Sequence, residues 1–336
     1  MFSSIRKRVV GIATTAVCLA AATACAGPAP APTNGAPNLT FRMNLTAGSL
    51  TTLGLFVARD MGYFAKAGLQ AQSVTTNLGT SALQLLTSEQ LDVASIDIPS
   101  AINARAAGAD IAIVSGLERH APVALQCRKD IGATPGYPAG VTSLAGKSIG
   151  ITAVGAASDT FGRIILSSAG VDPAKVSLVP LGGVPNFIAA IKAKRVDCVM
   201  SFQPIQHQLA DEVQTIVDVQ KGEGPAILTN AAYGVAATTN KFATANPEVI
   251  TRFRQAIKAA NAFLADPANA PAVATGVASD YPGVSHDELV TLVRAVQATY
   301  ADGETIPASA FEDSVKAYNL AYGKNITANQ SELVLK

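Results

Sequence analysis

The sequence contains no tryptophan, and aromatic residues make up only 5% and charged residues only 15% of its 336 positions. The formal net charge is +1, so the chain has neither the stacking platforms nor the basic surplus that binding to nucleic acid usually requires. We therefore expect no nucleic acid partner. The length is sufficient for two domains of ordinary size, each with its own core.

Motifs for catalysis and for metal binding are also missing. The three histidines, His120, His207 and His286, lie far apart, and no two of them have the H-x-x-x-H spacing of a metal site. The sequence has no G-x-S-x-G nucleophile elbow, no P-loop and no paired-carboxylate motif. These absences argue against an enzyme and against a bound metal or cofactor.

The N-terminus has the pattern of an export signal. Arg6, Lys7 and Arg8 precede an apolar run over residues 9–24, which is shorter than the roughly 20 residues of a membrane-spanning helix. Small residues then lead to Cys25 and to the stretch "PAPAPTNGAP", whose composition is typical of an unpacked tether. This pattern resembles the lipobox of bacterial lipoproteins, although Ala22 stands where a larger aliphatic residue is usual.

The lipobox resemblance implies three things about the first 38 residues. Residues 1–24 are expected to be a lipoprotein signal peptide, Cys25 to carry the lipid, and residues 25–38 to form a flexible tether. The protein is then exported and anchored to the membrane, in the periplasm or on the outer face of the cell membrane. The alternative is an ordinary signal peptide that is cut nearby and releases a free protein.

The rest of the chain repeats one order of elements. The first half is expected to contain strands at 39–45, 71–75 and 91–97, a helix over 50–64, and the loops "TAGS" (46–49) and "NLGT" (77–80). The second half is expected to contain strands at 147–152, 175–183 and 196–202, a helix in "DTFGRIILSSAGV", and a helix around Phe187. Both halves therefore have the order β-α-β-α-β.

Units of this kind form parallel sheets flanked by helices, and ligands bind beyond the carboxyl ends of the strands. The C-terminal part is helical by its apolar spacing, with starts marked by Asn246-Pro247 and by a capping box from Ser285 to Glu288. Because these helices must cover an existing sheet, we assign them to the first half.

At this point the chain resembles a known family, the substrate-binding proteins of ABC importers with the type II periplasmic-binding fold, in the nitrate, sulfonate, taurine and thiamine-precursor group. The resemblance runs from about residue 39 to 330. It rests on the order and spacing of "GLFVARDMGYFAKAGLQ", "LLTSEQLDVASID", "LAGKSIGITAVGAASDT" and "LGGVPNFIAAIKAKRVDCVMSFQP".

The resemblance implies an α/β protein of two lobes, each a mostly parallel sheet flanked by helices. Lobe I is expected to comprise residues 39–121 and 231–336, and lobe II residues 122–230. The family topology also places the strand "VALQC" antiparallel to "DCVMS", which makes a disulfide between Cys127 and Cys198 possible in an exported chain. The alternative is two buried, reduced thiols.

The loops between the lobes supply the candidate ligand-binding residues. Helix N-termini and hydroxyls suit anionic oxygens, glycines allow close backbone approach, and the other side chains add charge, an acceptor or a ring. Each serine or threonine has the alternative role of capping its own helix. The candidates are Thr46, Ser49, Thr51, Thr52, Gly79, Thr80, Asp97, Arg119, His120, Ser158, Thr160, Gly183, Gln203 and Tyr233.

The family implies a monomeric solute-binding protein that captures a small anionic organic molecule, of the sulfonate or carboxylate type, and delivers it to an ABC permease and its ATPase. Alternatives are a ligand such as a thiamine-precursor pyrimidine or another heterocycle, and a ligand-sensing lipoprotein. An enzyme is the remaining alternative, since the yeast-type pyrimidine synthase has similar lobes. That synthase carries a cysteine-rich motif which this sequence does not contain.

Overall fold

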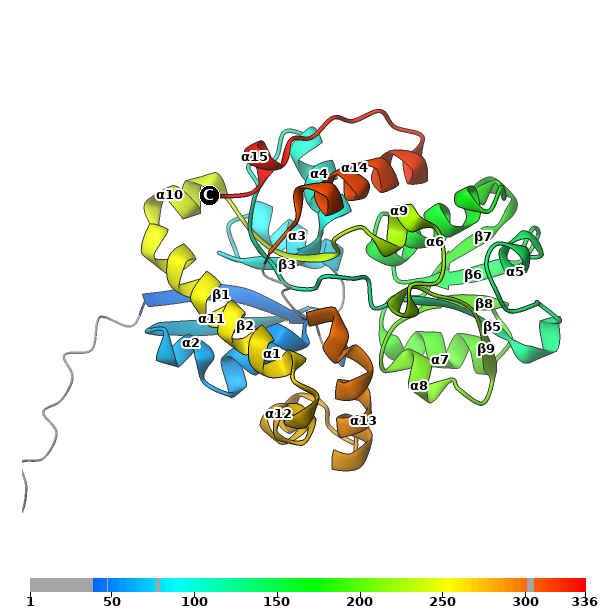
Figure 1. The fold of residues 1–336 in the computed structure, drawn as a ribbon, viewed down its shortest axis with the longest axis horizontal. Coiled ribbons are helices and arrows are strands. Elements are labelled where there is room, and N and C mark those ends of the chain that lie inside the picture. Colours follow the sequence, from blue (N-terminus) through cyan, green and yellow to red (C-terminus); the bar gives the residue numbers. More distant parts are fainter. Residues whose placement is uncertain (1–38, 47, 77–78, 301–304) are drawn as a thin grey trace, which may run out of the picture. The chain divides into compact units, whose positions relative to one another are not determined.

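The computed structural model describes residues 39–336 except 47, 77–78 and 301–304. The signal peptide, Cys25 and the tether expected from the sequence lie outside the described residues. The strands form sheets of two, three and five strands, and the ribbon in Figure 1 shows them gathered in two lobes. No described helix is long and apolar enough to cross a membrane.

Lobe I is built on strands from both ends of the described chain. Its strands are β1 (Leu39–Thr46), β2 (Leu69–Thr76), β3 (Ala94–Asp97), β4 (Ala112–Gly116) and β10 (Gly234–Thr238). Strand β1 is parallel to β2, and a parallel bridge between Met43 and Val93 joins β1 to the start of β3. Strand β10 lies between β3 and β4 and is antiparallel to both, so the order across the lobe is β2-β1-β3-β10-β4.

Lobe II repeats this arrangement with a continuous five-stranded sheet. Its strands are β5 (Ala124–Arg128), β6 (Ser148–Ile151), β7 (Ser177–Pro180), β8 (Cys198–Ser201) and β9 (Val213–Asp218). The order is β7-β6-β8-β5-β9, with β6 parallel to β7 and β8, and β5 antiparallel to β8 and β9. In each lobe, therefore, one antiparallel strand enters an otherwise parallel sheet. The repeated strand order predicted from the sequence is confirmed.

Helices cover both faces of the sheets, as expected for parallel sheets whose strands are buried on each side. In lobe I they are α1 (Leu53–Asp60), α2 (Tyr63–Lys66), α3 (Gly79–Thr87), α4 (Ile98–Ala106), α10 (Asn240–Ala245), α11 (Pro247–Ala265), α12 (Ala270–Val277), α13 (His286–Val296), α14 (Ala308–Tyr322) and α15 (Gln330–Leu333). In lobe II they are α5 (Ala139–Thr142), α6 (Ala157–Ser168), α7 (Val184–Lys192), α8 (Ile205–Gln208) and α9 (Ala226–Thr229). Short 3₁₀ turns include Gln297–Tyr300.

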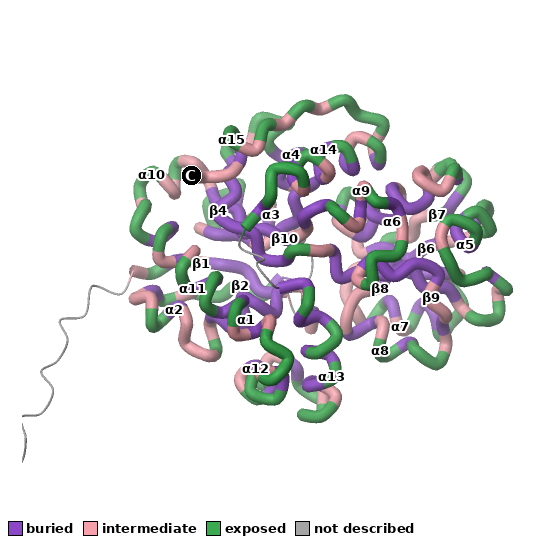
Figure 2. Tube along the Cα trace, viewed as in Figure 1, coloured by how far each residue is buried: buried purple, intermediate pink, exposed green. Residues whose placement is uncertain are grey.

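Alternation along the strands divides each core between two faces. In β10, Ala236 packs with α1, α11 and α13, while Val235 and Ala237 pack with α3, α4 and α14. In β8, Cys198 and Met200 face the α6 side and Val199 faces α7 and α8. Figure 2 shows the strands β4, β10 and β8 as buried segments, whereas the edge strands β2 and β7 are largely exposed or half-buried.

Three details differ from the sequence-based prediction. The helix expected over 50–64 is two helices, because Gly62 adopts a left-handed conformation (φ 77°) between α1 and α2. The loop expected at 77–80 ends earlier, since α3 begins at Gly79. Helix α14 is shared between the lobes, with Phe311 and Val315 in a lobe I core and Ala317 and Ala321 in a lobe II core.

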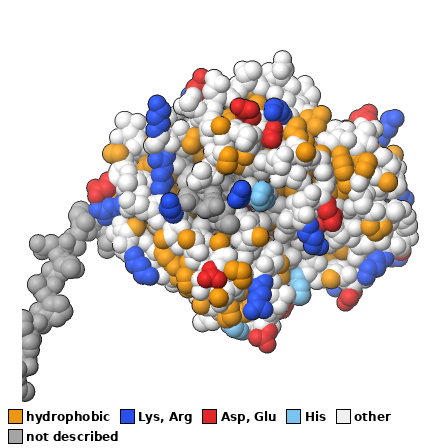
Figure 3. Space-filling view, viewed as in Figure 1, with side chains coloured by type: hydrophobic (Ala, Val, Ile, Leu, Met, Phe, Trp, Pro, Cys, Tyr) orange, Lys and Arg blue, Asp and Glu red, His pale blue; other side chains and the backbone are white. Residues whose placement is uncertain are grey.

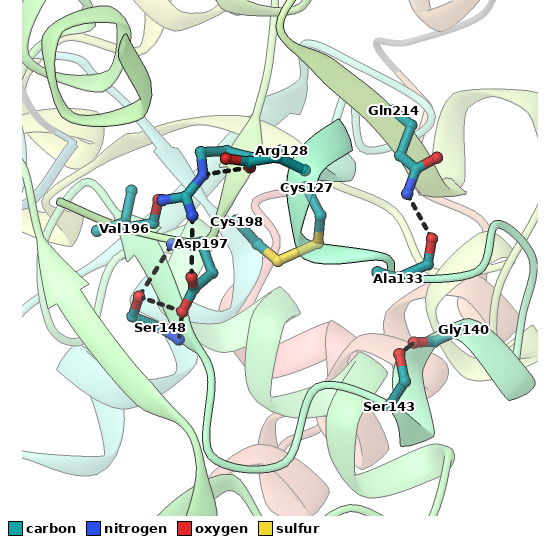
Figure 4. The surroundings of a disulfide bond; sticks show 11 residues. Cys127, Arg128, Ala133, Gly140, Ser143, Ser148, Val196, Asp197, Cys198 and Gln214 are labelled. Carbon is teal, nitrogen blue, oxygen red and sulfur yellow. Dashed lines mark hydrogen bonds and ion pairs between the residues drawn. A yellow bond between two sulfur atoms is a disulfide. The ribbon is translucent and has the colours of Figure 1, made fainter. Parts of the chain in front are cut away.

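The cysteines of lobe II form a disulfide within its sheet. Cys127 of β5 stands directly opposite Cys198 of β8 in the antiparallel register, and their sulfurs are bonded (Figure 4). Both residues are fully buried. Beside them, Arg128 donates to the carbonyl of Val196 and lies 3.6 Å from the carboxylate of Asp197. The covalent bond and this polar cluster both join β5 to the β8 region.

Charged side chains of both signs are scattered over the face drawn in Figure 3. This distribution agrees with a nearly neutral chain that has no field of one sign to attract a highly charged polymer.

Candidate functional site

A polar cavity of about 100 Å³ lies between the lobes, where the carboxyl ends of their parallel strands meet. Lobe I contributes Thr46, Ser49, Thr51, Asp97, Glu118 and Tyr233 to its lining. Lobe II contributes Thr152, Ala156, Ala157, Ser158 and Phe202. The walls thus come from strand ends and helix starts of both sheets, which is where open α/β sheets usually bind ligands.

The loop from β1 to α1 brings three hydroxyls to the polar cavity. Ser49 is 1% exposed, and its Oγ lies 2.9 Å from Thr51 Oγ1 and accepts a hydrogen bond from the Thr51 amide. Thr46 lines the cavity at the end of β1. Thr52, by contrast, accepts a bond from the Thr46 amide through Oγ1 and does not line the cavity, so it serves the loop itself.

Asp97 ends β3 and both caps a helix and lines the polar cavity. Its Oδ1 accepts a hydrogen bond from the Ser100 amide at 2.8 Å, and its Oδ2 accepts one from the Ser100 hydroxyl at 2.9 Å. Removal from water raises the pKa of Asp97, and the bonds from Ser100 oppose that rise. Asp97 therefore caps α4 and faces the cavity at the same time.

Glu118 is a second carboxyl in the polar cavity, and sequence analysis did not single it out. It follows β4 and is 3% exposed. Tyr300 donates its hydroxyl proton either to Glu118 Oε1, at 3.1 Å, or to the carbonyl of Leu50, at 2.6 Å. Burial raises the pKa of Glu118 well above its ordinary value, and the bond from Tyr300 opposes that rise.

Gly234 makes room for this carboxyl. A Cβ at position 234 would overlap Glu118 Oε2 and lie 3.1 Å from the carboxyl carbon. The carbonyl of Gly234 in turn accepts hydrogen bonds from the amides of Leu117 and Glu118. Glycine is required here for close approach, since its φ is not in the left-handed region.

Tyr233 places a ring beside the two carboxyls. It is half-buried, packs at 5.4 Å against Phe161 of lobe II, and lines the polar cavity. Burial raises the pKa of its phenol well above the ordinary value, and the charges of Glu118 and Asp97 raise it further. The phenol therefore remains a neutral hydroxyl at physiological pH.

Lobe II closes the cavity with the start of helix α6. Ser158 Oγ accepts a hydrogen bond from the Thr152 amide and lies 2.8 Å from the Thr152 hydroxyl. Ala156 and Ala157, at the same helix start, also line the cavity and carry no charged side chain. Thr152 and Phe202 join Glu118 as lining residues that sequence analysis did not select.

An apolar cavity of about 710 Å³ adjoins the polar one. Thr46, Ser49 and Phe202 line both of them. The wall of the apolar cavity comes largely from apolar side chains of α7, α13 and the loop before α13, among them Val184, Ile188, Tyr281, Pro282 and Leu292. Gly183, selected from the sequence, lies here and not in the polar cavity.

Several contacts join the lobes around these cavities. The amide of Leu50 donates to the carbonyl of Gln203 at 3.4 Å, and the hydroxyls of Thr160 and Tyr322 lie 2.8 Å apart. His207 of α8 lies 3.8 Å from the carboxylate of Glu288 on α13. The lobes are thus in direct contact on several sides.

The remaining candidates lie elsewhere. Arg119 and His120 line a separate hollow of about 320 Å³, and burial together with the charge of Arg119 lowers the pKa of His120. Thr160 lines a third interlobe cavity with Tyr322.

Gln203 Oε1 is buried without a hydrogen-bond partner in the described chain. Gly79 and Thr80 lie in the first turn of α3, and their side chains are outside the described part.

One signal could have pointed to Glu118. It directly follows the apolar strand "IAIVSGL", and acids at the carboxyl end of a parallel strand are candidates for a site. Thr152 follows β6 in the same way. Nothing in the sequence, however, indicates that Gly234 leaves space for a carboxyl that arrives from another strand. Among the described residues, no group of three or more His, Cys, Asp or Glu is arranged to hold a metal ion.

Comparison with known proteins gives a consistent result. A family model described as NMT1/THI5 like matches residues 50–270, which is more than half of the chain. A search of curated proteins finds no match.

Solved structures share the fold at low sequence identity. The alkanesulfonate-binding protein SsuA from Xanthomonas axonopodis pv. citri, bound to MOPS, has a TM-score of 0.71 at 15% identity, covering 89% of this chain and 99% of that one. The periplasmic nitrate-binding protein NrtA from Synechocystis PCC 6803 has a TM-score of 0.64 at 14% identity, covering 75% and 69%.

A Candida albicans gene product, described as having the generic periplasmic binding protein structural fold, has a TM-score of 0.69 at 17% identity, covering 90% of this chain and 97% of that one. At these identities the likeness shows the fold. The two-lobed α/β architecture predicted from the sequence is therefore confirmed.

Proposed function

The chain belongs to the NMT1/THI5 like family, and from this premise we propose that it is the extracytoplasmic solute-binding component of an ABC importer. Its ligand is a small organic molecule held in the polar cavity. The observation that carries this proposal is the composition of that cavity, because Ser49 and Thr51 from lobe I line it together with Thr152 and Ser158 from lobe II. A ligand that bonds to both walls stabilises the form in which the walls are close.

Lobe closure is the proposed mechanism. The ligand makes its full set of contacts only when the lobes meet, so it shifts the population toward the closed form. The contacts between Leu50 and Gln203 and between Thr160 and Tyr322 belong to that form. An ABC permease and its ATPase then recognise the closed protein and accept the solute. The protein acts as a monomer in this scheme.

Membrane anchoring through Cys25 supports delivery. A lipid on Cys25 and a tether over residues 25–38 keep the binding protein close to its transporter, which raises its effective concentration there. Labelling with a radioactive fatty acid, in the native chain and in Cys25→Ser, tests this part of the proposal.

Two ligand classes remain from the sequence. An anionic sulfonate or carboxylate is supported by the helix start at Ala156 and Ala157 and by the hydroxyls of the lining. A pyrimidine or another nitrogen heterocycle is supported by Asp97, which accepts hydrogen bonds.

A thermal-shift screen tests solute binding. At a ligand concentration of 100 Kd the free energy of unfolding rises by about 2.7 kcal/mol, which gives a clear increase in Tm. Ser158→Ala should reduce that increase, whereas Ser167→Ala, at the other end of the same helix and outside the cavity, should not. If no organic solute of any charge shifts the Tm, the proposed function is wrong.

A further inference from the structure

The polar cavity has carboxyl groups but no cationic side chain in its described lining. Asp97 and Glu118 are both present, and no lysine, arginine or histidine is among the described residues that line it. The other polar members are neutral hydroxyls, including that of Tyr233. A lining of carboxyls and neutral hydroxyls, without a cation among the described residues, favours a solute that donates hydrogen bonds.

The topology brings the two carboxyls to opposite sides of one residue. Strand β10 runs between β3 and β4, so Gly234 is paired with Asp97 on one side. On the other side, the Gly234 carbonyl accepts from the Glu118 amide at 3.3 Å, and the Glu118 carboxylate lies against the Gly234 Cα. Asp97 and Glu118 therefore flank the start of β10 and face the same cavity.

Oε2 of Glu118 can accept a hydrogen bond from a ligand, because no described residue donates to it. Glu118 is 3% exposed and lines the polar cavity, and among the described residues Tyr300 is the donor to its carboxylate, through Oε1. A carboxylate in a cavity is stabilised by hydrogen-bond donors, and most strongly by charged ones. Within the described residues Ser100 donates one bond to each oxygen of Asp97, and a carboxylate oxygen can accept more than one.

The two cavities differ in size as well as in chemistry. At about 100 Å³ the polar cavity has the volume of roughly three water molecules, which is enough for a small head group. The apolar cavity, at about 710 Å³, is large enough for an aromatic or aliphatic body. Phe202, Ser49 and Thr46 line both, so one molecule can occupy the two together.

We infer that the solute is an organic cation with an N–H donor head, of the ammonium or amidinium class, held between Asp97 and Glu118, and with an apolar body beyond Phe202 in the apolar cavity. This inference rests on the proposed function and specifies its substrate class. An anionic head in the same place would face two carboxyls with no described cation to offset them.

The groups that titrate around the head are consistent with this assignment. Burial raises the pKa of both carboxyls, and the phenols of Tyr233 and Tyr300, which face Glu118, remain neutral because burial raises their pKa too. A cation that enters between the carboxyls favours their charged forms, so binding should release protons and strengthen as the pH rises.

A matched panel tests the charge of the head. The probes are benzamidine, benzylamine and 2-phenylethylamine, each compared with its carboxylate or sulfonate counterpart, with benzamide as the neutral reference. Binding is measured by calorimetry and by the shift in Tm on the full exported protein. We expect at least tenfold tighter binding of the cations than of the matched anions.

Two variants test whether the cations bind between Asp97 and Glu118. Glu118→Gln and Asp97→Asn should each weaken binding of the cations at least tenfold, because they keep the shape and remove the charge. Glu312→Gln is the matched control, since Glu312 is exposed on α14 and outside both cavities.

The outcomes separate this inference from the proposed function. Tighter binding of the anions, or cation binding that both variants leave unchanged, overturns the charge assignment and leaves solute binding intact. A panel in which no cation, anion or neutral probe binds overturns both. The proton release on binding, measured in buffers of different ionisation enthalpy, gives a readout that does not depend on the variants.

Discussion

The carboxylate of Glu118 lies against the Cα of Gly234, in the space that a Cβ at position 234 would fill. This contact joins the segment after β4 to the first residue of β10, which are more than one hundred residues apart in the sequence. It also sets the position of one of the two acids in the polar cavity.

The first prediction concerns Gly234→Ala. The added methyl overlaps Glu118 Oε2, so the carboxyl must move within a packed site, at a cost of about 1–3 kcal/mol in the free energy of unfolding. We also expect ligand binding to weaken. Gly162→Ala is the control, because its Cβ would meet Met200 at an ordinary 3.5 Å within helix α6. Urea unfolding and calorimetry measure both effects, and equal behaviour of the two variants would contradict the prediction.

The second prediction concerns pH and Glu118. Because its pKa is raised in the folded protein, the folded state holds this proton more tightly than the unfolded state does. The contribution of Glu118 to stability is therefore greatest below its ordinary pKa of 4.5 and is lost as the pH rises toward the folded pKa.

Glu118→Gln removes this titration. Near pH 7 the ligand-free variant should be more stable than the native protein, and the difference should shrink as the pH falls toward 4. Unfolding in urea at a series of pH values measures the difference, with Glu312→Gln as the exposed control. A constant difference between native and variant over that range would show that Glu118 does not titrate with a raised pKa.

The third prediction concerns the disulfide. Cys127 and Cys198 are 71 positions apart, and closing a loop of that length lowers the entropy of the unfolded chain by an amount worth about 4 kcal/mol. The double variant Cys127→Ala/Cys198→Ala, or reduction of the native protein, should therefore lower the free energy of unfolding by about 2–5 kcal/mol. An unchanged urea midpoint in the presence of a reductant would argue that the bond contributes nothing to stability.

The fourth prediction separates two roles of Asp97. Asp97→Ala loses the cap on α4, with its bonds from Ser100, and should destabilise the protein by about 1 kcal/mol as well as weaken ligand binding. Asp97→Asn keeps an acceptor for the Ser100 amide, so its stability should stay close to native while ligand binding falls. Should Asn bind ligand as well as Asp does, the carboxylate at 97 acts only as a cap.

Much of the fold follows from patterns along the chain. The strand–helix order, the start of α11 at Pro247 and the capping of α13 by Ser285 could all be predicted, because alternation, helical spacing and caps are local features. The break at Gly62 was missed because the apolar spacing continues through it, so periodicity alone cannot detect a left-handed residue.

The candidate site could be predicted only in part. Ser49, Thr51, Asp97, Ser158 and Tyr233 lie at strand ends or helix starts, and the fold brings them to one cavity. Arg119 and His120 are adjacent in the sequence to Glu118, yet they line a different hollow. Sequence distance therefore does not decide which of these neighbours enters the polar cavity.

The sequence by itself determined the two repeated α/β halves, since hydrophobic periodicity requires each half to bury its strands beneath helices. The tertiary structure alone decided the chemistry between them. Asp97 and Glu118 share a cavity only because β10 returns from lobe II and enters between β3 and β4, with a glycine where the second carboxyl must fit. Such a meeting depends on long-range strand pairing, which no local pattern encodes.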